Sequence, residues 1–225
     1  MRWYLSRKAR DLTIRADSLL ALSSARKVFK NVELSHTLGL SEAALSKYYH
    51  GITVPATPMA ARLLSVLMSD EFAKKYVGRF MNKIGWDLRK AFTEPQFINF
   101  VSMYLKYKLM DKLPGLFVNK FLSLPDYSMS IASYLSVSLE IPLVITAEEN
   151  SIIGLEARGR SYTALQKGDY VISIHAILNK EIAEYFSYLV EAYNLKYVMA
   201  LSLILMDEDR VSEILKSPII YYLIP

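Results

Sequence analysis

The sequence predicts a fold of the α + α/β type, with an all-helical N-terminal part and a C-terminal part built on a mainly parallel sheet. Up to about residue 110, apolar residues recur at helical spacing. From Leu116 onward, short apolar runs such as Pro142–Thr146 and Tyr170–Ile174 alternate with helical segments, which is typical of a parallel sheet covered on both faces. Leu113-Pro114-Gly115 separates the two patterns.

The composition favours a folded chain without metal or disulfide chemistry. Of the 225 residues, 52% are hydrophobic and 22% are charged, enough for two small domains or one large one. The chain has no cysteine, and His36, His50 and His175 show no ligand spacing. We therefore expect no metal and no cofactor.

The apolar runs are too short to cross a membrane. The longest candidate, Tyr197 to Met206, falls far below the length of a spanning helix. The N-terminal stretch MRWYLSRKARD carries charges throughout and has no apolar signal core. These features predict a cytoplasmic protein with no membrane partner.

Charge is distributed unevenly along the chain. Residues 1–110 hold 18 Lys and Arg against 8 Asp and Glu, whereas residues 111–225 hold 9 against 14. A basic half joined to an acidic half suits a phosphate-facing module attached to another domain, although chance asymmetry of solvated helix faces is the alternative.

The stretch from Asn31 to Gly51 reads as two short helices joined by a glycine turn. The first helix is expected to be capped by Asn31 and to have an apolar face of Val32, Leu34 and Leu38, before a left-handed turn at Gly39. Ser41 is expected to cap a second helix, Glu42 to Tyr49, that packs through Leu45 and Tyr48. The residues left pointing outward are Ser41, Glu42, Ala43, Ser46 and Lys47.

This segment resembles the repressor-type helix-turn-helix family in its glycine, its apolar positions and its small or polar outer face. Ser35 stands where the family usually has Ala, and it is small enough to fit. The resemblance implies that the second helix reads the major groove of double-stranded DNA. An ordinary helical hairpin is the alternative interpretation. The expected phosphate contacts are Lys30, Tyr49, His50 and Arg62.

The remaining N-terminal residues predict further helices. Arg2 to Arg15 is either a basic arm or the start of a first helix, and Ala16 to Phe29 is helical by pattern. After the glycine at 51, Thr57 caps a helix with Pro58 at its first position. Residues 71–109 form aromatic-rich helices that pack between domains or form a dimer surface, with breaks near Gly78, Gly85 and Thr93-Glu94-Pro95. The expected domains are 1–70, 71–113 (a helical connector) and 114–225.

The C-terminal half predicts seven strands and three helices, with a turn at Lys167-Gly168-Asp169. The expected strands are Lys120–Leu124, Pro142–Thr146, Ile152–Leu155, Ser161–Leu165, Tyr170–Ile174 and Tyr197–Met206, with a last one at Ile219–Ile224. The expected helices are Met129–Leu139, Lys180–Tyr193 with Asn179 as its cap, and Asp209–Leu215.

This order of elements resembles the type I phosphoribosyltransferase fold, from Phe121 through Met206. The stretches FLSLPDYSMSIASYLSVSLEIPLVIT and QKGDYVISIHAILNKEIAEYFSYLVEAYNLKYVMALSLIL carry the resemblance. The family's two acidic residues after the signature strand are replaced here by His175 and Ala176, and its small phosphate loop by Asn179 to Ala183 with Glu181 in it. The departures imply a catalytically inactive relative, because the ribose and phosphate contacts are lost.

The sequence therefore predicts a transcriptional regulator in which a helix-turn-helix domain is fused to a degenerate phosphoribosyltransferase-like domain. Regulators that combine these parts form a known class, and this chain looks like a divergent, archaeal example. As a homodimer it would bind an inverted repeat. A nucleotide-like effector would enter a crevice whose candidate residues are Asp126, Tyr127, Ser128, His175, Asn179 and Lys180. An active phosphoribosyltransferase with a divergent loop and a protein-interaction scaffold remain the alternatives.

Overall fold

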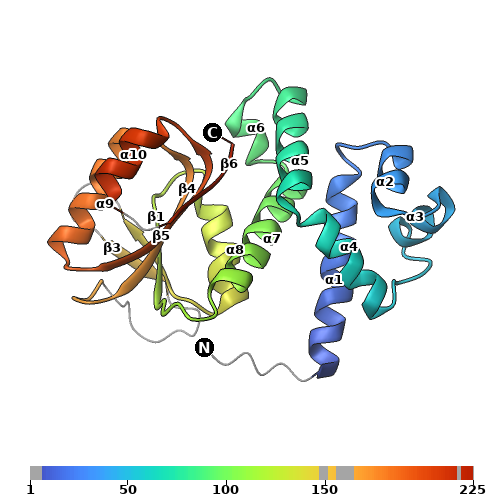
Figure 1. The fold of residues 1–225 in the computed structure, drawn as a ribbon, viewed down its shortest axis with the longest axis horizontal. Coiled ribbons are helices and arrows are strands. Elements are labelled where there is room, and N and C mark those ends of the chain that lie inside the picture. Colours follow the sequence, from blue (N-terminus) through green and yellow to red (C-terminus); the bar gives the residue numbers. More distant parts are fainter. Residues whose placement is uncertain (1–6, 147–151, 156–164, 217–218, 225) are drawn as a thin grey trace. The chain divides into compact units, whose positions relative to one another are not determined.

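The computed structural model describes residues 7–146, 152–155, 165–216 and 219–224, and these form helices followed by a mixed helix and sheet region (Figure 1). The chain divides into two compact units, Met1–Tyr107 and Lys108–Pro225. We describe each unit by itself. The expected division into 1–70, 71–113 and 114–225 stays a prediction.

Helices are the only regular secondary structure in the described residues of the first unit. The helices are α1 (Arg7–Ala25), α2 (Asn31–Leu38), α3 (Glu42–Tyr49), α4 (Thr57–Leu67), α5 (Asp70–Lys83), α6 (Leu88–Ala91) and α7 (Pro95–Lys112), the last of which continues across the division between the units. Helix α3 has the bounds expected from the sequence, whereas α2 begins at Asn31, the residue that was expected to cap it.

Three details of this unit differ from the expectation. The basic segment that ends at Arg15 and the segment that starts at Ala16 form one helix, α1. This helix ends at Ala25, four residues earlier than expected. The expected arm residues before Arg7 lie outside the described residues. Helix α4 begins at Thr57 itself, so that Ala56 is its N-cap residue. Gly78 lies inside α5, because the buried neighbours of that helix outweigh the roughly 1 kcal/mol that a helical glycine costs.

Aromatic side chains of α5 and α7 form the centre of the first unit. The Tyr76 and Phe100 rings stack with their centroids 3.8 Å apart, and Phe80 and Phe97 stack at 4.6 Å. Tyr76 is fully buried, as are Phe97 and Phe100. The interpretation of these aromatics as an interdomain or dimer surface is therefore wrong for the stacked rings, which instead make the core of one unit.

The second unit is built on a six-stranded sheet in the order β3-β2-β1-β4-β5-β6. The strands are β1 (Lys120–Ser123), β2 (Leu143–Thr146), β3 (Ile152–Leu155), β4 (Tyr170–Leu178), β5 (Lys196–Leu205) and β6 (Ile220–Ile224). Only β3 runs antiparallel to its neighbour, within the described residues. Of the strand expected at Ser161–Leu165, all but Leu165 lies outside the described residues, and Leu165 is not part of a strand.

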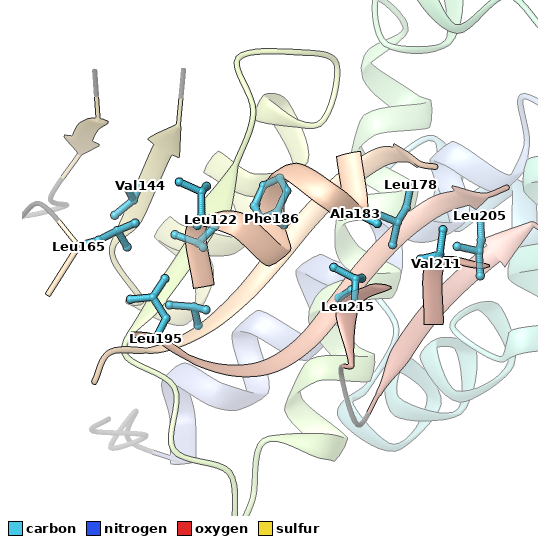
Figure 2. Packing of buried hydrophobic residues seen from close by; sticks show 13 residues of the cluster. Leu122, Val144, Leu165, Leu178, Ala183, Phe186, Leu195, Leu205, Val211 and Leu215 are labelled. Carbon is cyan, nitrogen blue, oxygen red and sulfur yellow. The ribbon is translucent and has the colours of Figure 1, made fainter. Parts of the chain in front are cut away.

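Helices cover both faces of this sheet, as Figure 1 shows: α9 (Lys180–Ala192) and α10 (Glu208–Leu215) lie on one face, and α8 (Met129–Leu139) lies on the other. One buried cluster lies between the sheet and helices α9 and α10 (Figure 2). It includes Phe186 of α9, Leu122 of β1 and Leu178 of β4. Strands β2 and β3 lie on one side of the β1–β4 pair, and β5 and β6 lie on the other side. The winding of the sheet therefore reverses between β1 and β4. Such a point is where ligands bind in open α/β sheets, at the carboxyl ends of the strands.

Candidate functional site

The turn between α2 and α3 is fixed by glycine and serine. Gly39 has a φ of 61°, a left-handed conformation that favours glycine. The Leu40 N–H donates to the Ser35 carbonyl at 3.1 Å, and the Ser35 hydroxyl donates back to the Leu40 carbonyl at 2.5 Å. Ser35, which the sequence showed only to be small enough for its position, therefore closes the turn with its side chain.

The helix caps agree with the expectation for α3 and differ for α2. The Ser41 hydroxyl accepts a hydrogen bond from the Ala44 N–H at 3.2 Å, as expected of an N-cap. Asn31 is already the first residue of α2, and its predecessor Lys30 is the N-cap. The Lys30 N–H donates to the Glu33 carboxylate at 3.0 Å, so the donor satisfied by a side chain here belongs to the N-cap residue itself.

The structure leaves the expected outer face of α3 accessible. Glu42, Ala43 and Lys47 are exposed and Ser46 is half-buried, whereas Leu45 is fully buried and Tyr48 is half-buried. On α2, Leu34 and Leu38 are buried, but Val32 is 54% exposed and does not belong to the apolar face. The face expected to read bases is therefore a short surface of small and polar side chains.

Of the four residues expected to contact phosphate, Lys30 and His50 are exposed, but Tyr49 and Arg62 are engaged within the protein. The Tyr49 hydroxyl is buried and has no hydrogen-bond partner among the described residues, and burial raises its pKa to about 12. The Arg26 guanidinium lies over the Tyr49 ring, 4.4 Å from its centroid. A buried hydroxyl does not face solvent in this structure, so a phosphate contact from Tyr49 would need α3 to rearrange, and its expected role stays a prediction.

Arg62 has a structural contact that the sequence did not indicate. Its guanidinium donates to the carbonyl of Leu38, the last residue of α2, at 3.3 Å. A cation at the C-terminus of a helix satisfies a carbonyl that has no partner within the helix. Arg62 therefore stabilises the end of α2, while its exposed side chain still lies at the surface.

In the second unit, five of the six candidate crevice residues lie at the carboxyl ends of β1 and β4. Asp126, Tyr127 and Ser128 follow β1, and Asn179 and Lys180 follow β4, so the topology places both groups beside the point where the winding reverses. The structure thus brings together two segments that are about 50 residues apart in the sequence.

The chain's own side chains occupy the helix starts at this edge. The Asp126 carboxylate accepts hydrogen bonds from the Ser128 N–H at 2.7 Å and from the Ser128 hydroxyl at 2.5 Å, just before α8. The Asn179 side chain accepts from the Ile182 N–H at 3.0 Å and caps α9, as the sequence predicted. These backbone donors are the groups that hold phosphate in anion-binding loops, and both are already used.

His175, the sixth crevice candidate, lies within β4 and not at its end. The strand continues to Leu178, and His175 is 2% exposed. Its Nε2 lies 2.7 Å from the Ser173 hydroxyl oxygen, which also bonds the Tyr197 hydroxyl, and its ring meets Phe186 edge-on. The strand continues past His175 because it stays paired with β5 up to Leu178, and the hydrogen bond to Ser173 satisfies the buried ring. Burial lowers the pKa of His175 to about 3.

The edge of the sheet at the carboxyl ends of the strands carries more acidic than basic side chains. Exposed carboxylates follow each of the strands β1, β4 and β5: Asp126, Glu181, Glu184, Asp207, Glu208 and Asp209. The exposed cations in the same segments are Lys180 and Arg210. Lys180 is itself 3.6 Å from Glu184. The run Asp207-Glu208-Asp209 was readable in the sequence, but its place at this edge depends on where β5 ends. The edge is therefore poorly suited to a polyanion.

The described residues give no sign of a metal site or a membrane span. No group of three or more His, Asp or Glu lies together in this part of the chain so as to hold a metal ion. No helix formed by these residues is both long and apolar enough to cross a bilayer.

No protein-family model and no curated protein matches the chain. Solved structures are similar in fold to its C-terminal part. Adenine phosphoribosyltransferase from Saccharomyces cerevisiae is 15% identical, with a TM-score of 0.46 over 59% of this chain and 82% of that one. The enzyme of the same name from Thermoanaerobacter pseudethanolicus is 15% identical, with a TM-score of 0.42 over 60% and 83%. UMP synthase from Leishmania donovani is 20% identical, with a TM-score of 0.46 over 61% and 29%.

Proposed function

We propose that the protein is a DNA-binding regulator whose helix α3 enters the major groove. The observation that carries the proposal is the surface of α3. Its outward side chains are small or polar and accessible, and its apolar side packs inward through Leu45. A short helix that follows a left-handed glycine turn and presents such a face is the arrangement that helix-turn-helix proteins use to reach base edges.

In this proposal the base contacts come from the start and middle of α3. Lys47 is the one exposed cation of α3 and would donate to guanine acceptors or to a phosphate. Lys30 and His50 would contact phosphates on either side, while Tyr49 supports the helix from inside. A second copy of the chain, bound to the other half of an inverted repeat, would double the contacts and set the spacing of the half-sites.

We further propose that the sheet of the second unit does not catalyse phosphoribosyl transfer. Transfer from phosphoribosyl pyrophosphate requires donors for a phosphate and a pyrophosphate, yet Asp126 and Asn179 each already accept from one backbone N–H at the start of a helix. The surrounding carboxylates would repel the substrate. A role in dimerisation, or in binding a nucleoside-like effector, is compatible with this edge.

The proposal is tested by a gel-shift titration with fragments of the protein's own upstream region and excess non-specific competitor. We expect discrete complexes that survive competitor and that Lys47→Ala weakens by about 5- to 150-fold, as loss of one base contact of about 1–3 kcal/mol requires. Lys74→Ala, which removes an exposed cation of α5, is the matched control. Failure of the wild type to form any discrete complex would overturn the regulator proposal.

The catalytic question needs a separate assay. The protein is incubated with phosphoribosyl pyrophosphate, Mg²⁺ and each of the common purine and pyrimidine bases in turn, and pyrophosphate release is followed. We expect release no faster than in the absence of protein. Base-dependent turnover would show that the second unit is an active transferase and would overturn the non-catalytic proposal, whatever the result with DNA.

A further inference from the structure

Five cationic side chains of the first unit gather where the turn between α1 and α2 meets α5. We call them the turn–α5 patch: Arg26, Lys27, Lys30, Arg79 and Lys83. The Lys83 ammonium donates to the Lys27 carbonyl at 3.4 Å, which brings the end of α5 to the turn. Arg79 lies over the Phe29 ring, 4.7 Å from its centroid. Four of the five were not among the residues that the sequence pointed to.

Part of the patch lines an open hollow. Residues 26–32 line a hollow of about 430 Å³, and three of these seven residues are the patch members Arg26, Lys27 and Lys30. All five patch side chains are exposed. A hollow this open has no walls to enclose a small metabolite, but it can accept part of a long, regularly charged chain.

The charge of the patch is poorly compensated by the protein. The acidic group in contact with it is Glu33, whose carboxylate is 2.8 Å from Arg79 and also accepts the Lys30 N–H. Those two contacts, the backbone hydrogen bond first, lower the pKa of Glu33. One carboxylate against five cations leaves a strong local excess of positive charge, and like charges held this close repel one another unless an anion binds.

We propose that the turn–α5 patch is a second contact surface for the DNA phosphodiester backbone, beside the surface of α3. This inference rests on the proposed DNA-binding function. Arg26 joins the two surfaces, because it lines the hollow and also lies over Tyr49 of α3. Duplex DNA that docks on α3 therefore passes the patch, and its phosphates, about one per 1.7 Å of helix axis, neutralise the excess charge.

The test measures how binding to a mixed-sequence duplex of 40 base pairs depends on salt, by fluorescence anisotropy between 50 and 200 mM KCl. The variant Lys27→Ala/Lys83→Ala removes two patch cations and also the hydrogen bond from Lys83 to the Lys27 carbonyl, so its circular dichroism and urea midpoint are compared with the wild type first. The control Lys74→Ala/Lys90→Ala removes the same charge from exposed positions of α5 and α6. Each phosphate contact contributes about 0.9 to the slope of log K against log salt.

We expect the patch variant to bind several times more weakly at 50 mM KCl and to lose about 1.8 from the slope, while the control keeps the wild-type slope. Equal slopes for the patch variant and the control would overturn this inference. If in that case the wild type still forms discrete complexes that Lys47→Ala weakens, the proposed function stands alone. Absence of wild-type binding to any duplex would instead remove both proposals.

Discussion

The guanidinium of Arg62 donates a hydrogen bond to the carbonyl of Leu38, and it lies where a β-carbon on Gly39 would be. A β-carbon built on Gly39 would be only 2.6 Å from Arg62 Nη2, whereas one built on Gly51 meets no atom within 4 Å. Both glycines have a left-handed φ, 61° and 64°. The contact between α4 and the end of α2 therefore depends on the absence of a side chain at Gly39.

Gly39→Ala should destabilise the protein more than Gly51→Ala. Each change places alanine in a left-handed conformation, at a cost of about 1–2 kcal/mol, but only Gly39→Ala also displaces Arg62. Urea unfolding gives the two free energies, and repeating both in an Arg62→Ala background should remove the difference. An unchanged difference in that background would show that Arg62 is not what the new methyl group meets.

Tyr49→Phe should leave DNA binding unchanged and stabilise the protein by about 1 kcal/mol, because it removes a buried hydroxyl that has no partner among the described residues. Anisotropy with duplex DNA and urea unfolding measure the two effects. Weakened binding, with the fold intact, would mean that the hydroxyl reaches the DNA after a rearrangement of α3.

His175 should make the second unit sensitive to acid. Burial lowers the pKa of His175 from 6.5 to about 3, so the folded chain keeps the ring neutral where the unfolded chain protonates it. The stabilisation is present above pH 6.5 and is lost as the pH falls from 6.5 towards 3, by several kcal/mol at most. His175→Gln keeps a hydrogen-bonding group without that titration. Its urea midpoint should fall less than that of the wild type between pH 7 and pH 4, and parallel curves would refute the assignment.

The buried ion pair at the amino end of the sheet should be costly to break. Lys120 Nζ is 2.8 Å from Asp169 Oδ2, and each side chain is 7% exposed. Lys120→Met leaves a buried carboxylate held only by Asn119 and the Gln166 N–H, which should cost about 3–5 kcal/mol.

The exposed pair between Lys75 and Glu71 is the control for this change, and Lys75→Met should cost less than about 1 kcal/mol. Adding Asp169→Asn to Lys120→Met should recover part of the loss, since the uncompensated charge is then absent. Thermal or urea unfolding of the three variants checks the order. A Lys120→Met protein as stable as Lys75→Met would show that Asp169 remains solvated.

Local signals in the sequence were sufficient to predict the positions of most helices and strands. The glycine at 39 marks the end of α2 and the serine at 41 marks the start of α3, and the structure confirms both positions. The alternation of apolar runs and helices likewise predicted the parallel sheet, with α8 (Met129–Leu139) and β3 (Ile152–Leu155) at their expected positions.

Contacts between distant residues could not be predicted in the same way. Arg26 and Tyr49 are 23 residues apart, and Arg62 and Leu38 are 24 apart, so neither pairing leaves a trace in local periodicity. His175 is a polar residue that local propensity places at a strand end. It lies inside β4 because β4 pairs with β5 beyond this point, and Ser173, two residues earlier, gives the buried ring a hydrogen-bond partner.

Asn179 caps α9, and Asp126 binds Ser128 just before α8, so any anion that arrives at this edge of the sheet meets competition at both helix starts. Such an anion competes with a group tethered a few residues from the helix start, whose effective concentration is on the order of millimolar or higher. A free phosphate compound would have to be more abundant than that, or bind far more tightly, to displace it. Ligand screens on this protein should therefore begin with uncharged or cationic compounds.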